Sequence, residues 1–183
     1  MPKAPIYNMY YVALICPPEV DKKVEQHKYW MKDQFGCVVA LNSPAHITLI
    51  PPFWLAETGE TELINTVQSF TSDLAELDIQ LDNFSHFGKK VLIIGVKENP
   101  ALEEIKKPVE LHFIRVFGDV IQADSRPFHP HITMANRDIK LSDFEKAWDH
   151  FSKKTFQASF RTKTISLLKL RSGIWNTIAD KIW

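Results

Sequence analysis

Two copies of one short motif contain the residues of this chain best suited to chemistry. The tetrapeptide His-Ile-Thr-aliphatic occurs as HITL beginning at His46 and as HITM beginning at His131, far apart in the chain. Successive side chains of a β-strand point to opposite faces, so each histidine would share a face with the threonine two residues later. We therefore expect His46 with Thr48, and His131 with Thr133, to present an imidazole and a hydroxyl together.

Two such pairs facing each other could surround one phosphodiester. A neutral imidazole could take a proton from water or from an attacking hydroxyl, and an imidazolium could give one to the leaving oxygen, because the ordinary pKa of histidine is near neutrality. The threonine hydroxyls could donate hydrogen bonds to the non-bridging oxygens as negative charge grows there. The motifs therefore predict one acid–base site for a phosphodiester, for which we expect no cofactor.

The elements that would carry the motifs follow the same order in both halves of the chain. Apolar and β-branched runs predict strands at 6–16, 37–42, 46–50, 78–84, 89–96, 131–134, 159–170 and 174–183. Apolar residues at helical spacing predict helices at 20–35, 63–77, 102–116 and 142–151. Each half then contains a strand, a helix, a motif strand and a helix, which is the pattern that an internal duplication leaves.

Local signals set the expected ends of these elements. Pro51 and Pro52 are expected to end the first motif strand, and Pro108 to kink or break the third helix. Ser142 and Glu145 are expected to form a capping box at the start of the fourth helix.

The length and composition predict one globular domain. The 183 residues fit a single domain over 1–183, with two lobes of about 1–77 and 78–183 that share a cleft and could exchange strands. We expect a monomer. Cys16 and Cys37 lie in apolar runs and are expected to be buried thiols in strands, which suits the cytoplasm. No apolar run is long enough to span a bilayer, so no membrane partner is expected.

The charge balance restricts the partners. The formal net charge is zero, which argues against long duplex nucleic acid as a partner, because such proteins usually carry a basic face. Small anions, cyclic nucleotides and the 3′ ends of RNA strands remain suitable, because a few local positive groups are enough to bind them.

The two motifs in their context resemble the two-histidine (2H) phosphoesterase superfamily, which includes bacterial 2′-5′ RNA ligase-like proteins and cyclic phosphodiesterases. The segments HITLIPPF and FHPHITMA match its paired His-x-Thr/Ser-x signature, and the closing segment ISLLKLRSGIW extends the match over nearly the whole chain. The resemblance implies a bilobal α+β fold, with two antiparallel sheets related by an approximate twofold axis, helices outside and a central cleft. It also implies metal-independent chemistry on RNA-type phosphates, such as hydrolysis of a 2′,3′-cyclic phosphate or 2′-5′ ligation.

Carried over from the family, His46 and His131 become the acid–base pair, and Thr48 and Thr133 the phosphate ligands. The chain departs from the ligase-like members at one point. These often have an arginine directly after the sequence His-x-Thr-x-Ala, where this chain has Asn136, and its arginine, Arg137, follows one residue later. This departure concerns a ligase-type RNA contact and leaves the four motif residues unaffected.

Four further residues are candidates for substrate binding. Arg126 precedes the second motif and could supply a fixed positive charge for a phosphate. Phe53, Phe87 and Phe128 lie near the motifs or at the expected hairpin between the strands at 78–84 and 89–96, and one of them could stack on a base.

Two alternatives to a two-histidine enzyme remain open. The first is a receptor that keeps the four motif residues and binds a phosphate or an RNA end without turnover. The second is a metal-dependent hydrolase built on His129 and His131, with Asp124 or Asp138 as further ligands, because His-x-His can bind a metal and such sites usually recruit carboxylates.

Overall fold

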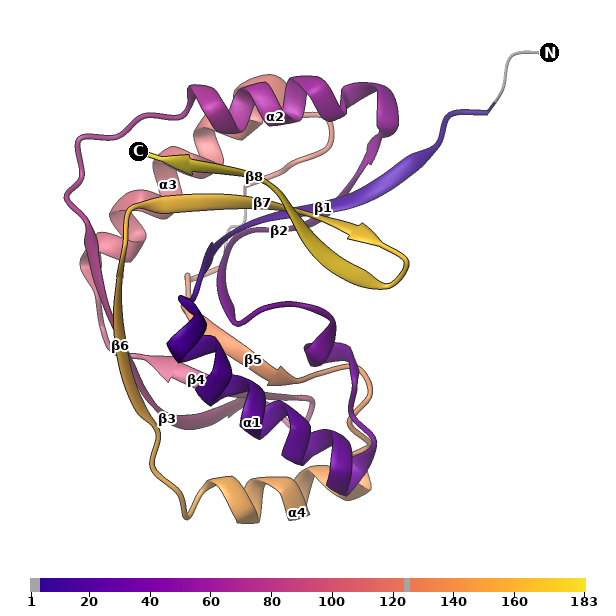
Figure 1. The fold of residues 1–183 in the computed structure, drawn as a ribbon, viewed down its shortest axis with the longest axis vertical. Coiled ribbons are helices and arrows are strands. Elements are labelled where there is room, and N and C mark those ends of the chain that lie inside the picture. Colours follow the sequence, from indigo (N-terminus) through magenta and orange to yellow (C-terminus); the bar gives the residue numbers. More distant parts are fainter. Residues whose placement is uncertain (1–3, 124–125) are drawn as a thin grey trace.

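The chain folds into two four-stranded sheets with helices packed along them (Figure 1). The structure is a computed structural model and describes residues 4–123 and 126–183. Within those residues the strands are β1 (Tyr7–Ile15), β2 (His46–Ala56), β3 (Leu77–Phe87), β4 (Val91–Val96), β5 (His131–Ala135), β6 (Gln157–Thr162), β7 (Thr164–Arg171) and β8 (Ile174–Ile182). The α-helices are α1 (Pro18–Phe35), α2 (Glu60–Ser69), α3 (Pro100–Phe117) and α4 (Leu141–Phe151), with short 3₁₀ helices η1 (Val39–Asn42) and η2 (Glu57–Gly59).

Both sheets are antiparallel and place a motif strand at one edge. The first has the order β2-β1-β7-β8 and the second the order β5-β4-β3-β6. The expected α+β fold with two antiparallel sheets is confirmed. The last two strands, β7 and β8, lie beside β1, so the sheet of the first motif contains strands from the end of the chain.

The helices connect the two halves. In Figure 1, α2 and α3 run along the first sheet, and α1 and α4 along the second. Contacts cross between the halves, because α1 packs against β5 and β6, whereas α3 packs against β2. The motif strands β2 and β5 also contact each other. Each motif strand is therefore supported by a helix from the other half of the sequence.

Strand β1 separates two apolar layers. Tyr10 and Leu14 point into the main core, whereas Tyr11 and Ala13, which alternate with them, pack with Leu168 in a second, smaller cluster. The two sets follow from the two-residue period of a strand. The first sheet consequently has one face in the core and another that carries the smaller cluster.

The expectations that Pro51 ends a strand and that Pro108 kinks or breaks a helix were wrong. β2 does not end at Pro51 but continues to Ala56, with register shifts against β1 that accommodate the prolines. An edge strand tolerates a residue without an N–H, because that side of the strand needs no hydrogen-bond donor. Helix α3 likewise continues through Pro108 without interruption. It begins at a conventional cap, in which the Asn99 side chain accepts a hydrogen bond from the Ala101 N–H at 3.2 Å.

Three further boundaries differ from the expectation. The segment expected to be a strand at 37–42 contains the 3₁₀ helix η1 instead, although Cys37 is buried as expected. The second helix ends at Ser69 rather than at residue 77, because the chain is extended at Phe70. The capping box at Ser142 does not form, since α4 already begins at Leu141. Among the described residues, no helix has the length and apolar character needed to cross a membrane.

Candidate active site

The motif side chains alternate as predicted on both strands. On β2, His46 and Thr48 are half-buried, whereas Ile47 is fully buried on the core side. On β5, His131 and Thr133 repeat the half-buried pattern, and the aliphatic residues between and after them are buried. Each motif therefore anchors its strand with apolar side chains and leaves an imidazole and a hydroxyl on the other face.

Both histidines are held by the same backbone contact. His46 Nδ1 lies 2.7 Å from the carbonyl oxygen of Pro44, and His131 Nδ1 lies 2.7 Å from the carbonyl oxygen of His129. A carbonyl oxygen can only accept a hydrogen bond, so Nδ1 carries the proton in each ring. This arrangement leaves Nε2 of each neutral imidazole without a proton and able to accept one.

A cavity of about 660 Å³ joins the two motif strands. Thr48 borders it from β2, together with Pro51 and Pro52, and His131 borders it from β5. Its volume lies within the range that holds a small ligand. One predicted site residue of each motif thus borders this space, whereas His46 and Thr133 are not among the residues that line it.

Burial lowers the pKa of both motif histidines. Desolvation is the main cause for His46, whose pKa falls to about 4; the positive charges of Lys28 and His131 lower it further, and the hydrogen bond to Pro44 opposes them. The pKa of His131 is also lowered from 6.5, mainly by desolvation, with the hydrogen bond to His129 acting in the opposite direction. Both imidazoles are therefore neutral at pH 7 in the unliganded site. An anionic phosphate between them would raise the pKa of the ring that it contacts.

Two buried groups beside His46 were missed by the sequence analysis. The ring of Tyr11 on β1 stacks on the imidazole with centroids 4.8 Å apart, and its hydroxyl lies 3.4 Å from Nδ1. Lys28 on α1 is only 3% exposed, and its Nζ donates a hydrogen bond to the carbonyl oxygen of Ser43 at 3.0 Å. Only the pairing of β1 with β2 and the packing of α1 bring these groups to the motif, so no local sequence signal could identify them.

The four other candidate residues have different positions. Arg126, Phe87 and Phe128 all border the cavity. Phe87 is 40% exposed, and its ring lies edge-on to His131 at 4.9 Å. Phe53 does not border the cavity: it is 7% exposed and packs in the core near Tyr10, so its expected role in stacking on a base is not supported by its position.

One cavity residue is not among the candidates that the sequence offered. Lys106 on α3 borders the same cavity, and its Nζ lies 5.5 Å from the centre of the Phe128 ring. It also forms an ion pair with Glu110 at 3.2 Å. A cation held over an aromatic ring at the cavity wall adds to the positive potential in which an anion would bind.

Among the described residues, His129 and His131 are not joined by a third potential metal ligand. No group of three or more potential metal ligands occurs in the part of the chain that the structure describes. Asp124 lies outside the described residues. Asp138 accepts hydrogen bonds from the N–H groups of Val38 and Val39 at 2.6 and 2.8 Å, so its Oδ2 holds the start of η1.

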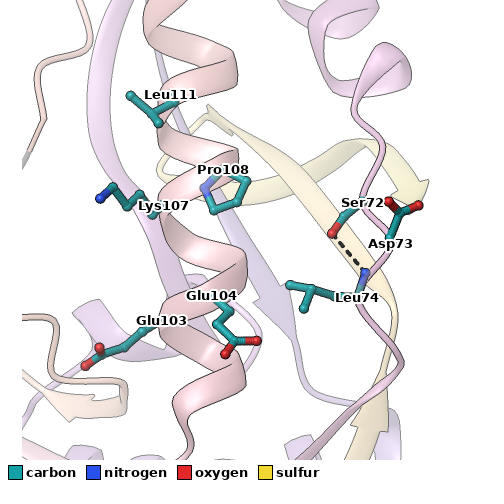
Figure 2. A pocket seen from close by; sticks show the side chains of 8 residues that line it. All are labelled: Ser72, Asp73, Leu74, Glu103, Glu104, Lys107, Pro108 and Leu111. Atoms are coloured by element: carbon teal, nitrogen blue, oxygen red, sulfur yellow. Dashed lines mark hydrogen bonds between the residues drawn. The ribbon is translucent and has the colours of Figure 1, made fainter.

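A second cavity, of about 730 Å³, lies away from both motifs (Figure 2). It is bordered by α3 and by the segment before β3, where the Ser72 hydroxyl accepts a hydrogen bond from the Leu74 N–H at 3.2 Å. Its rim carries three carboxylates against one lysine, and it contains no histidine. This cavity is less suited than the first to an anionic substrate.

Comparison with known proteins identifies the family of this chain and proteins that share its fold. The sequence matches the family model described as the 2′-5′ RNA ligase superfamily over residues 16–173. A Bacillus pumilus (strain SAFR-032) protein named "Putative phosphoesterase" is 30% identical over 103 residues, which make up 56% of this chain and 56% of that protein. The aligned part is thus little more than half the length of this relative.

Two solved structures share the fold. The protein TT0787 of Thermus thermophilus superimposes with a TM-score of 0.65 at 15% identity, covering 94% of this chain and 96% of that one. E. coli LigT complexed with 3′-AMP gives a TM-score of 0.64 at 18% identity, covering 96% of this chain and 98% of that one. At these identities the likeness establishes the arrangement of the elements.

Proposed function

Because the chain belongs to the 2′-5′ RNA ligase superfamily, we propose that the cavity between β2 and β5 hydrolyses 2′,3′-cyclic phosphates at RNA ends or on nucleotides. One observation carries the proposal: a single cavity of about 660 Å³ is bordered by Thr48 from the first motif and His131 from the second. The reaction would need no metal and no cofactor. The complex of LigT with 3′-AMP supports a nucleotide-sized substrate.

The two histidines would divide the acid and base roles. The pKa of His46 is lowered to about 4, so its Nε2 would be a free base at neutral pH and could accept the proton of the attacking water. His131 would carry a proton once the anionic phosphate has raised its pKa, and would give that proton to the departing 3′ oxygen. The P–O bond to water forms as the P–O3′ bond breaks, and the product is a 2′-phosphate.

The threonines would stabilise charge on the phosphate. Thr48 and Thr133 stand two residues beyond the two histidines on the same strand faces, roughly 7 Å from them. Their hydroxyls could donate hydrogen bonds to the two non-bridging oxygens. A 2′-5′ ligation would use the same groups. An RNA hydroxyl would then attack the phosphorus in place of water, and the bond from phosphorus to the 3′ oxygen would break as before.

The test is hydrolysis of 2′,3′-cyclic mononucleotides by His46→Ala and His131→Ala. Loss of a general acid or base typically lowers the rate by about 10²- to 10⁴-fold. We expect the hydrolysis rate of each variant to fall by at least this much, while circular dichroism shows an unchanged fold. His129→Ala is the matched control, because it removes a neighbouring imidazole but keeps the backbone carbonyl that holds His131. Full activity in the double variant would refute the proposal.

One observation favours a second candidate function, a receptor without turnover. Burial lowers the pKa of both imidazoles, so neither motif histidine carries a second proton for the leaving oxygen in the unliganded site at pH 7. Incubation with cyclic nucleotides distinguishes the two functions, because a receptor would bind them and return them unchanged. Activity that persists in excess EDTA would exclude the metal-dependent alternative.

A further inference from the structure

The motif of β2 shares its sheet face with the smaller apolar cluster. His46 pairs directly with Ile15 of β1, and Thr48 with Ala13, and directly paired residues of neighbouring strands lie on the same face. Tyr11, two residues from Ala13, stacks on His46 and belongs to that cluster. The catalytic face of the first sheet therefore extends over β1 and does not end at the motif.

Aromatic side chains continue along this face beyond the motif. By the alternation of β1, Met9 and Tyr7 point to the same side as Tyr11, and Trp54 is paired directly with Met9. Tyr7 is 56% exposed and Trp54 is 55% exposed, although both are large apolar side chains. Trp175 of β8 borders the other side, with its ring edge-on to Tyr11 at 4.5 Å. We call this set, Tyr7, Met9, Tyr11, Trp54 and Trp175, the aromatic face; Tyr7 and Trp54 are its exposed rings, whereas Tyr11 is 2% exposed and is buried beneath it.

We propose that the aromatic face binds unpaired bases of an RNA strand whose terminal phosphate occupies the catalytic cavity. This inference rests on the proposed function and narrows its substrate class from RNA ends or free nucleotides to the ends of oligonucleotides. Every base has a flat π-surface, so exposed tyrosine and tryptophan rings can stack on bases without regard to sequence. Four-stranded antiparallel sheets with surface aromatics bind two or three bases in this way in a common RNA-binding module.

The distances fit an oligonucleotide rather than a single nucleotide. Thr48 is opposite Ala13, and Trp54 is opposite Met9, four residues further along β1. At about 3.3 Å per residue this separation is about 13 Å, which places Trp54 beyond a nucleoside held at the phosphate but within reach of its upstream neighbours. None of the five side chains of the aromatic face is charged, so none of them repels the phosphate backbone.

An RNA strand suits this face better than a protein partner does. The aromatic face begins at the catalytic pair itself, so its occupant has to be continuous with the substrate. The cavity beside α3 offers no comparable surface for RNA, since Asp73, Glu103 and Glu104 on its rim would repel phosphates (Figure 2). Binding of a second copy of the chain is the alternative that the experiment has to separate.

The experiment compares the binding of a single-stranded RNA hexanucleotide ending in a 3′-phosphate with that of the matching 3′-mononucleotide. In the natural protein we expect the hexanucleotide to bind roughly 5- to 100-fold more tightly, as gained by stacking one base. Trp54→Ala should remove most of this advantage, and Trp54→Phe should keep much of it. Tyr29→Ala is the matched control, because Tyr29 is also an exposed aromatic residue but lies on α1.

The outcomes separate this inference from the proposed function. Binding needs no turnover, so it can be measured even if the protein does not hydrolyse cyclic phosphates. If hydrolysis is absent but Trp54→Ala loses the preference for the hexanucleotide, the proposed enzyme activity is refuted and RNA binding by the aromatic face is supported. Equal affinities for hexanucleotide and mononucleotide in the natural protein would overturn the inference. It would also be overturned if Trp54→Ala changed the oligomeric state in sedimentation experiments without changing the RNA preference.

Discussion

The lowered pKa of His46 makes the stability of the protein depend on pH in a specific way. The pKa is about 4 in the folded state, against 6.5 for an ordinary histidine. Below pH 6.5 the unfolded chain therefore binds a proton that the folded chain does not. The contribution of neutral His46 to stability is complete above 6.5, is lost progressively as the pH falls towards 4, and does not change further below that. At 1.36 kcal/mol per unit, the total loss is at most about 3 kcal/mol.

Urea unfolding between pH 8 and pH 4 measures this effect. Other groups also titrate in that range, so the informative quantity is the difference in the free energy of unfolding between the natural protein and His46→Gln, which cannot be protonated. We expect this difference to shift by about 2 to 3 kcal/mol in favour of the variant as the pH falls from 7 to 4. The corresponding exchange at the exposed His129 is the control. A difference that stays constant with pH would show that His46 is not desolvated, and would remove the reason for assigning it the role of base.

The pairing of each histidine with a threonine on one strand face could be predicted from the sequence because it depends on local geometry. The alternation of a strand fixes which residues accompany each histidine, and the repetition of the motif indicated that the two strands meet. On each motif strand the histidine and the threonine lie on one face, and one cavity touches Thr48 of the first motif and His131 of the second. The surroundings of His46 could not be predicted in this way, because Tyr11 and Lys28 reach it through strand pairing and helix packing.

The errors in the fold also have physical causes. Leu74 and Leu77 continue the helical spacing of α2, but they serve the core from an extended segment and from β3, and periodicity alone does not distinguish these uses. Phe53 lies six residues after Ile47, so the alternation of β2 places it on the core side once the strand is known to continue past Pro51 and Pro52. The register shifts on either side of Ile50 depend on the partner strand, so they cannot be read from a single segment.

Two further predictions concern the second motif and the pH dependence of catalysis. Gly95 of β4 is paired with His131, and a Cβ at this position would lie 2.9 Å from the carbonyl oxygen of Asp82. Because backbone has to move to relieve that contact, Gly95→Ala should destabilise the fold by about 1 to 3 kcal/mol in thermal unfolding. It should also lower kcat, because the strand that supports His131 shifts. An unchanged melting temperature would contradict the close approach. The mechanism needs one neutral and one protonated histidine, and the pKa values of both His46 and His131 lie below 6.5 in the unliganded site. The profile of kcat/KM, which reports the free enzyme, should therefore have its maximum between about pH 4 and 6.5, whereas the profile of kcat should extend to higher pH because bound phosphate raises the pKa of the acid. A kcat/KM maximum above pH 7 would mean that the proton is supplied by another group.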